Sequence, residues 1–137
     1  MNSGPFDEPL LLRDAIEADR DQLALHSSAI PFLGYPFYVA VRGSVVVGYL
    51  AWQRTAPDEC EVLQLEVLPE FRRQGVASQL LSEFLKQSYS NVFLEVRTSN
   101  LQALQLYEKL GFTKIGIRRN YYSHPTEDGI VLAFHPC

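Results

Sequence analysis

Apolar residues recur along the chain with two spacings, the alternation typical of strands and the three-to-four-residue repeat typical of helices. The plainest hairpin joins Phe37–Arg42 to 45–54 through the Gly43-Ser44 turn, and its arms are rich in valine and aromatic residues. Gly48 in the second arm indicates a bulge. Further strands are expected at residues 10–13, 62–67, 92–97, 112–122 and 130–134.

Three segments favour helices. After Gly75, apolar residues at 76, 80, 81, 84 and 85 repeat with helical spacing as far as a polar break near residues 88–90. Asn100 opens another helix, with a stripe at 103, 106, 107 and 110 and Gly111 at the C-terminal cap. The weakest helix follows Asp19, which has capping-box spacing to Gln22, with Leu23, Ala24 and Ile30 as its apolar stripe. This order predicts a mixed α/β sheet with helices on its faces.

Composition supports one folded domain over residues 1–137. The 137 residues are 47% hydrophobic and 20% charged, which excludes a charge-rich disordered chain. The longest apolar runs are strand-length, well short of the roughly 20 residues that span a bilayer. Asp7 and Glu8 lie in an N-terminal segment that resembles no targeting signal, so we expect a cytoplasmic protein without a membrane partner.

Charge and cysteine content exclude further classes. Sixteen acidic against twelve basic residues give a net charge of −4, which argues against nucleic-acid binding because phosphate backbones require a basic field. The two cysteines, Cys60 and Cys137, have no neighbouring histidine cluster with zinc spacing. We expect a buried thiol, a loose terminal thiol and no metal.

The segment from Val67 to Ala77 combines a strand end, two arginines and the start of a helix at Gly75. Helix N-termini present free N–H groups and positive potential, which together attract anions. The glycine spacing fits neither a nucleotide-binding P-loop nor a dinucleotide fingerprint. Read alone, the segment is also compatible with an ordinary basic helix start. It resembles the Arg/Gln-x-x-Gly-x-Gly/Ala loop of the GNAT acetyltransferases, which holds the pyrophosphate of acetyl-CoA.

A second block strengthens this resemblance. Leu94-Glu95-Val96-Arg97-Thr98-Ser99-Asn100, Tyr107-Glu108, Gly111-Phe112 and 116–122 are similar to the RimI group, whose members acetylate a ribosomal protein's N-terminal α-amine. The resemblance is close over residues 37–134. It implies the GNAT fold, a mostly antiparallel sheet of about seven strands with three to four helices, and acetyl-CoA as co-substrate.

The resemblance also implies a role for each matched residue. Glu95 matches the general base, and Tyr107 the acid that protonates the departing thiolate. Without the resemblance, Glu95 could pair with Arg97 or face solvent, and Tyr107 could be a core aromatic. Cofactor contacts are implied for Leu65, Glu66, Val67, Arg73, Gln74, Gly75, Val76, Ala77, Ser78 and Asn100. Glu66 departs from the small residue usual there, and a second base, an amine anchor or a solvent-facing residue all remain open.

Arg118, Tyr121 and Tyr122 match the border of the acceptor groove, although an aromatic edge strand would have the same sequence. Residues 15–36 are shorter than the two-helix insertion usual in the RimI group. The acceptor is therefore expected to be a protein N-terminus or, alternatively, a small amine. A catalytically silent acyl-CoA-binding module is the third reading.

Overall fold

The computed structural model describes residues 8–88 and 90–136. Within them, seven strands form a sheet in the order β1-β2-β3-β4-β5-β7-β6, accompanied by three α-helices and two short 3-10 helices. The β4–β5 pair is parallel, whereas β1–β2, β2–β3, β5–β7 and β6–β7 are antiparallel. The predicted mixed α/β architecture is confirmed. The chain separates into two compact units, the first reaching Gln53 and including Val62–Gln87, the second made of Arg54–Glu61 and the residues from Ser88 onward.

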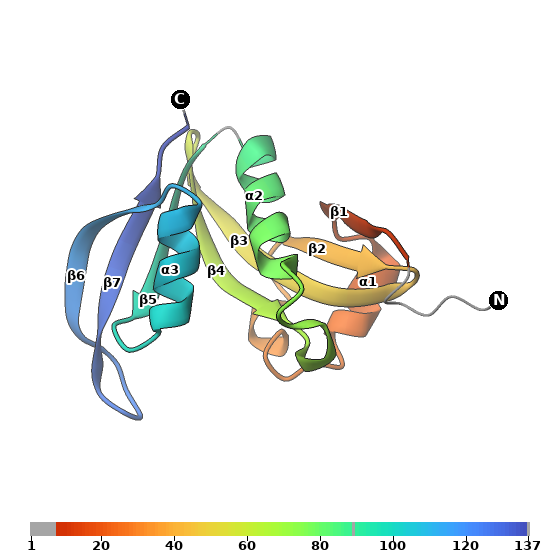
Figure 1. The fold of residues 1–137 in the computed structure, drawn as a ribbon, viewed down its shortest axis with the longest axis horizontal. Helices are drawn as coiled ribbons and strands as arrows, with labels where there is room; N and C mark the ends of the chain where they lie inside the picture. The colour runs from red at the N-terminus through yellow and green to blue at the C-terminus, as the bar shows by residue number, and fades with distance from the viewer. Residues whose placement is uncertain (1–7, 89, 137) are drawn as a thin grey trace. The chain divides into compact units, whose positions relative to one another are not determined.

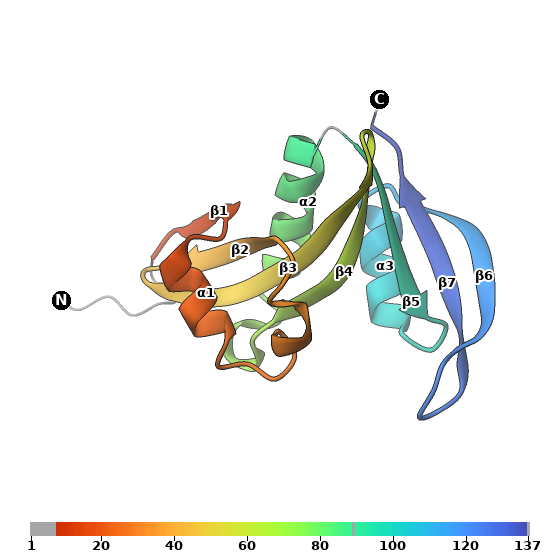
Figure 2. The ribbon, with the colours of Figure 1, turned by 180° about the vertical axis from the view of Figure 1, so that it is seen from behind.

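The first unit is built on β1 (Leu10–Asp14), β2 (Phe37–Arg42), β3 (Val45–Ala56) and β4 (Glu59–Val67). Helices α1 (Glu17–Leu23) and α2 (Val76–Ser88) lie on opposite faces of β2 and β3 (Figures 1 and 2). The α2 residues buried are the five that the helical spacing predicted, Val76, Leu80, Leu81, Phe84 and Leu85.

Strand β2 is buried on both faces because a helix covers each one. Phe37 and Val39 belong to the core cluster that includes Leu23 of α1. On the other face, the Tyr38 ring lies 5.9 Å from that of Phe84 in α2. A strand buried on both sides reads as a continuous apolar run rather than an alternating one.

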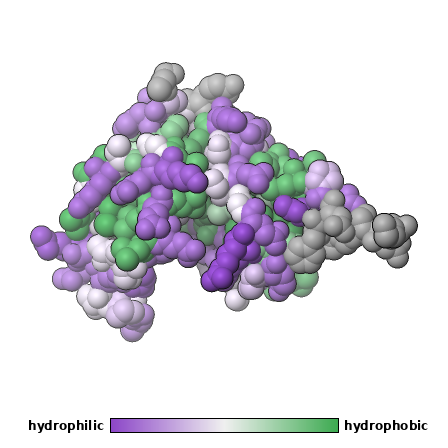
Figure 3. Space-filling model, in the orientation of Figure 1, coloured by the Kyte–Doolittle hydropathy of each residue, from purple (hydrophilic) through white to green (hydrophobic). Residues whose placement is uncertain are grey.

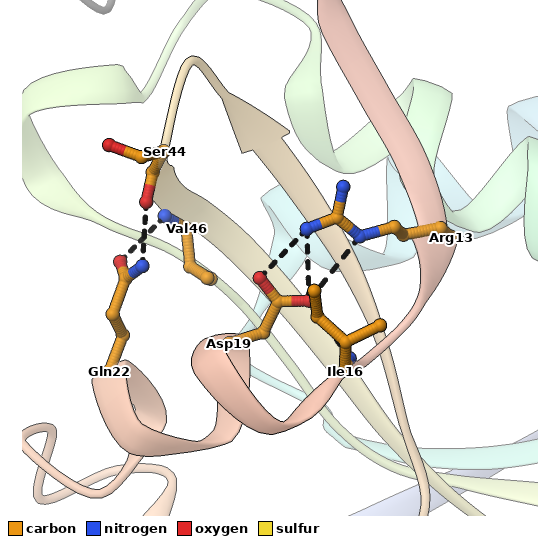
Figure 4. Close-up of polar contacts among 6 residues, drawn as sticks. All are labelled: Arg13, Ile16, Asp19, Gln22, Ser44 and Val46. Atoms are coloured by element: carbon orange, nitrogen blue, oxygen red, sulfur yellow. Dashed lines mark hydrogen bonds and ion pairs between the residues drawn. The ribbon is translucent and has the colours of Figure 1, made fainter.

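Helix α1 is attached to the sheet by polar side chains (Figure 4). The Asp19 carboxylate binds the Arg13 guanidinium at 3.0 Å and accepts the Ile16 N–H at 3.0 Å. Gln22 accepts the Val46 N–H at 2.9 Å and donates to the Ser44 carbonyl.

The prediction for this helix was wrong in three respects. Asp19 lies inside the helix rather than at its cap and bonds backward to Ile16. Ala24 is exposed. Ile30 lies in a separate 3-10 helix, Ile30–Phe32, with 52% of its surface exposed. Leu23, Ala24 and Ile30 do not form one helical stripe, because α1 ends at Leu23 and a turn follows it.

The predicted bulge in β3 is confirmed beside Gly48. Ala40 pairs with Gly48 and Val41 with Val46, so Val47 is the additional residue. A Cβ at Gly48 would lie 3.2 Å from both the Glu66 carbonyl oxygen and Val76 Cγ1. Gly48 therefore lets β4 and α2 approach β3 closely.

The second unit contains β5 (Asn91–Arg97), α3 (Leu101–Lys109), β6 (Thr113–Tyr122) and β7 (Glu127–Phe134). Helix α3 covers one face of β5 and β7 (Figures 1 and 2). As predicted, Asn100 caps it by accepting the Ala103 N–H at 3.1 Å, and Gly111 follows it with φ +102°. Ile115 and Ile117 of β6 are about half exposed. Figure 3 shows apolar residues at the surface on the left of its view.

The sequence predictions on cysteine are confirmed in part. Cys60 is fully buried, and burial raises the pKa of its thiol. Cys137 lies outside the described residues.

No helix in 8–88 or 90–136 combines the length and apolar character needed to cross a membrane. Across the same ranges, no three His, Cys, Asp or Glu side chains converge as a metal site would require.

Candidate functional site

The loop between β4 and α2 takes two left-handed backbone conformations, at Arg73 (φ 64°) and Gly75 (φ 78°). The Gln79 N–H donates to the Gly75 carbonyl at 3.0 Å and closes the first turn of α2. The N–H groups of Val76, Ala77 and Ser78 precede that bond and therefore have no partner within the helix. The loop thus ends in three amides directed out of the helix start.

Arg72 organises this loop. Its Nε donates to the Val67 carbonyl at 2.9 Å, and its Nη2 lies 2.7 Å from Glu66 Oε1. The Glu66 carboxylate, 28% exposed, is therefore the counter-charge of Arg72. The sequence left three roles open for Glu66, and the structure indicates a fourth. Through Arg72, the Glu66 carboxylate attaches the loop to the end of β4.

The other residues expected to contact the cofactor in this unit lie in the same stretch. The Gln74 side chain donates to the Glu70 carbonyl at 3.4 Å, and the exposed Arg73 has no ion-pair partner in the described part of the chain. Leu65 and Val67 are partly buried residues of β4. The Val67 carbonyl is already occupied by Arg72.

Glu95 lies on β5 with Phe93 and Arg97 on one face, while Val92, Leu94 and Val96 are buried on the other. Its carboxylate does not pair with Arg97. Instead, Oε1 lies 3.1 Å from the Arg118 Nε of β6, and the buried Oε2 has no hydrogen-bond partner among the described residues. Burial raises the pKa of the Glu95 carboxyl, Arg118 opposes this, and Glu61 adds to it. A carboxylate held this way is suited to accept a proton.

A cavity of about 200 Å³ opens beside this carboxylate. Its walls include Glu95 and Arg118, the apolar Phe93 and Val131, and two further carboxylates, Glu59 and Glu61. Sequence reasoning missed Thr55, Glu59 and Glu61 as site residues. The alternation of Glu59 and Glu61 on β4 was a weak signal, whereas Thr55 lies on β3. The parallel pairing of Glu61 with Phe93, which brings the two carboxylates here, is not visible in the sequence.

Tyr107 lies on helix α3. Its ring packs against Phe112 at 5.7 Å between centroids. Burial, and to a lesser extent the neighbouring Tyr122 phenol, raises the pKa of Tyr107 to about 12. The phenol therefore keeps its proton at neutral pH. Asn100 has the capping role described above, and a coenzyme contact by its side chain remains a prediction.

Arg118, Tyr121 and Tyr122 lie together near Glu95. The Arg118 guanidinium carbon is 5.2 Å from the Tyr121 ring centroid, and that of Arg97 is 4.5 Å from the Tyr122 ring centroid. Burial and the nearby Glu95 charge raise the pKa of Tyr122. The second unit therefore gathers Glu95, Arg118, Tyr121 and Tyr122, whereas residues 65–67 and 73–78 belong to the first unit.

Comparison with known proteins defines the class. The model of the acetyltransferase (GNAT) family matches residues 9–112, which is most of the chain. The chain belongs to this family. A solved structure of the ribosomal-protein-S18-alanine N-acetyltransferase from Escherichia coli has the same fold, with a TM-score of 0.80, 26% identity and coverage of 92% of this chain and 93% of that one.

Two curated relatives narrow the resemblance. The ribosomal protein bS18-alanine N-acetyltransferase of Escherichia coli K12 is 43% identical over 76 residues, 53% of this chain and 50% of that protein. An N-alpha-acetyltransferase of Saccharolobus solfataricus is 34% identical over 116 residues, 73% of this chain and 69% of that protein. The chain thus spans about half the length of the first relative and about two thirds of the second.

Proposed function

We propose that this protein transfers the acetyl group of acetyl-CoA directly to the α-amino group of a protein N-terminus. The observation that carries the proposal is the geometry of Glu95, whose one oxygen is held by Arg118 while the other is buried and unpartnered among the described residues. The names of the two relatives, a ribosomal protein bS18-alanine N-acetyltransferase and an N-alpha-acetyltransferase, support the acceptor class.

In the proposed reaction, the amine nitrogen attacks the thioester carbonyl, forming a C–N bond as the C–S bond breaks. Glu95 takes the proton that the amine loses, and Tyr107 gives its phenolic proton to the departing thiolate of coenzyme A. The Tyr107 phenol, whose pKa burial raises to about 12, is protonated at neutral pH and can donate a hydrogen bond to the thiolate as it forms. Both groups then return to their starting state by proton exchange.

Most of the coenzyme contacts are assigned to two stretches of the first unit. The amides of residues 73–78 would bind the pyrophosphate, since a helix N-terminus offers donors and positive potential. Residues 65–67 would hold the pantetheine arm, and the Asn100 side chain would contact the coenzyme. This arrangement needs no metal for anion binding.

The α-amine is favoured over lysine by its acidity. An α-amine has a pKa near ~7.7–8.0 and a lysine near ~10.4, so deprotonating the lysine at neutral pH costs about 3.5 kcal/mol more. One carboxylate base is then sufficient.

A small polyamine or amino-acid amine is the second candidate acceptor. The cavity beside Glu95 favours it, because Glu59 and Glu61 add two carboxylates that would attract a further cationic group. The volume, about 200 Å³, is below the ~300 Å³ at which small-molecule pockets usually begin.

One experiment separates these readings. Release of free coenzyme A thiol is measured with acetyl-CoA and a panel of acceptors: peptides with a free N-terminus, the same peptides blocked at the N-terminus but containing lysine, and polyamines. We expect fastest turnover with free N-termini and little with Glu95→Gln. Faster turnover of polyamines would transfer the assignment to small amines. Coenzyme binding without turnover of any acceptor would indicate a silent binding module.

A further inference from the structure

Strand β6 contains a wide irregularity beside the Glu95 site. Between the pairs Arg118–Gly129 and Tyr122–Glu127, three β6 residues, 119–121, face Asp128 alone. Asn120 takes a left-handed conformation, φ 51°, and its N–H donates to Asp128 Oδ1 at 2.8 Å. Bulges of this kind redirect side chains near functional sites.

The consequence is that two neighbouring tyrosines lie on one face. Successive residues of a regular strand point to opposite faces. Here, a Cβ built at Gly129 would lie 3.2 Å from Tyr122 Cε2 and 3.4 Å from Tyr121 Cδ2. The two rings meet edge to face with centroids 5.0 Å apart. Both rings therefore pack over the bare backbone of Gly129.

This is the face that carries Glu95. Gly129 pairs with Arg97 of β5, and Glu95 pairs with Val131, two residues away on each strand and so on the same side. Arg118, opposite Gly129, connects the tyrosines to the base: its Nε lies 3.1 Å from Glu95 Oε1, and its guanidinium lies over the Tyr121 ring.

The Tyr122 ring has little freedom to move away. The Arg97 guanidinium lies over it at 4.5 Å, and three acceptors hold that guanidinium: the Ser123 and Pro125 carbonyls, each at 3.1 Å, and Glu127 at 3.2 Å. Tyr121, in contrast, has 51% of its surface exposed. The pair thus combines a fixed ring with an accessible one.

We propose that Gly129 is a positioning residue for the acceptor, because the absence of its side chain lets Tyr121 and Tyr122 form, with Arg118, an aromatic wall beside Glu95 against which the acceptor chain packs. The inference rests on the proposed function and goes beyond it, since it assigns acceptor specificity to a backbone position that touches no substrate. Aromatic rings with polar tips suit a peptide, which offers both apolar stems and hydrogen-bonding groups.

The test is Gly129→Ala, with steady-state kinetics in both substrates. The added methyl is tighter against Tyr122 than ordinary van der Waals contact and displaces the wall by a few tenths of an ångström. Because a ~1 Å misplacement can cost ~100-fold, we expect KM for the acceptor peptide to rise about 3- to 10-fold. KM for acetyl-CoA is expected to stay unchanged. Gly116→Ala is the matched control, since Gly116 faces Val131 in the same strand pair and a Cβ there meets nothing within 4 Å.

Asn120 provides an independent route to the same result. Valine disfavours a positive φ, so Asn120→Val should disturb the bulge and raise acceptor KM as Gly129→Ala does, whereas Asn120→Gly keeps the conformation and should not. This pair decides the question if Gly129→Ala does not fold. Unchanged acceptor KM in Gly129→Ala, or equal increases for both substrates, overturns the inference while leaving the proposed function intact. A wild-type protein that acetylates no peptide amine overturns both.

Discussion

Replacing Gly75 with alanine separates the conformational need for glycine from a binding role of the β4–α2 loop. Gly75 has φ +78°, and a Cβ built there meets only Gln79 Nε2, at 3.8 Å. The substitution therefore creates no clash. Its cost to folding is the left-handed conformation, about 1–2 kcal/mol for a residue with a side chain. For a domain of this size, that lowers Tm by about 3–10 °C.

The cost to coenzyme binding has a separate origin. If a phosphate approaches the amides at the start of α2, the new methyl group stands on its path. Loss of one hydrogen bond to a charged group is worth about 1.5–3 kcal/mol, and this corresponds to about a 10- to 150-fold increase in Kd for coenzyme A. We expect this weakening at temperatures where the variant is fully folded, as judged by circular dichroism, with affinity measured by titration calorimetry.

Gly111→Ala is the matched control. Gly111 also has a positive φ, +102°, and a Cβ there would lie 3.3 Å from Phe134 Cε2, so this variant should lose at least as much stability. It has no proposed contact with coenzyme A and should bind it normally. Equal loss of affinity in the two variants would mean that binding follows stability alone. Unchanged affinity in Gly75→Ala would refute the assignment of the loop.

Three further predictions address single groups. Removing the Arg118 charge with Arg118→Gln should raise the pKa of Glu95. On the acid side of the pH profile, kcat/KM should therefore begin to fall at a higher pH than in the wild type. The control variant Lys114→Gln should leave the pH profile unchanged. Tyr107→Phe should lower kcat by ~10²- to 10⁴-fold at every pH without changing the affinity for the coenzyme. Full activity of this variant would mean that Tyr107 is a core aromatic and not the acid. Glu66→Gln should weaken coenzyme binding only a few-fold, because a partly exposed ion pair is worth about 0.2–1 kcal/mol. Glu70→Gln, on the same loop, should leave coenzyme binding unchanged. An equal loss of affinity in both variants would exclude a special role for the Glu66–Arg72 pair.

Elements with strong local signals were predictable from the sequence. Turn residues predict the β2–β3 hairpin, and helical spacing predicts the five buried positions of α2. Asn100 and Gly111 predict the two ends of α3. Each of these signals lies within about a dozen residues. Helix α1 was misjudged because its contacts are with distant strands. Asp19 is fixed by Arg13, and Gln22 by the turn before Val46, so tertiary contacts define it more than periodicity does.

The site shows the same division. The glycine at the start of α2 was predictable because its conformation depends on neighbouring residues, whereas the coenzyme role of this loop remains a prediction. The partner of Glu95 was not predictable, because the sequence offered Arg97 on the same strand face while the structure uses Arg118 from another strand. Glu59 and Glu61 were missed for the same reason, since only the parallel β4–β5 pairing places them beside Phe93. A single domain over 1–137, a cytoplasmic location and the roles of the site residues remain predictions.

The sheet order sets the distance that the Arg118 side chain spans to reach Glu95. Strand β7 lies between β5 and β6, so Arg118 must reach Glu95 across an intervening strand, a span of about 10 Å between strand axes at the usual ~4.8 Å spacing. The residue that Arg118 faces on β7 is Gly129, and the atoms nearest to a Cβ built there belong to Tyr121 and Tyr122. Lysine lacks the Nε that contacts Glu95, and its single ammonium cannot also stack broadly on Tyr121. Gly129 therefore accommodates both tyrosine rings, while Arg118, its partner in the strand pair, links Tyr121 to the base.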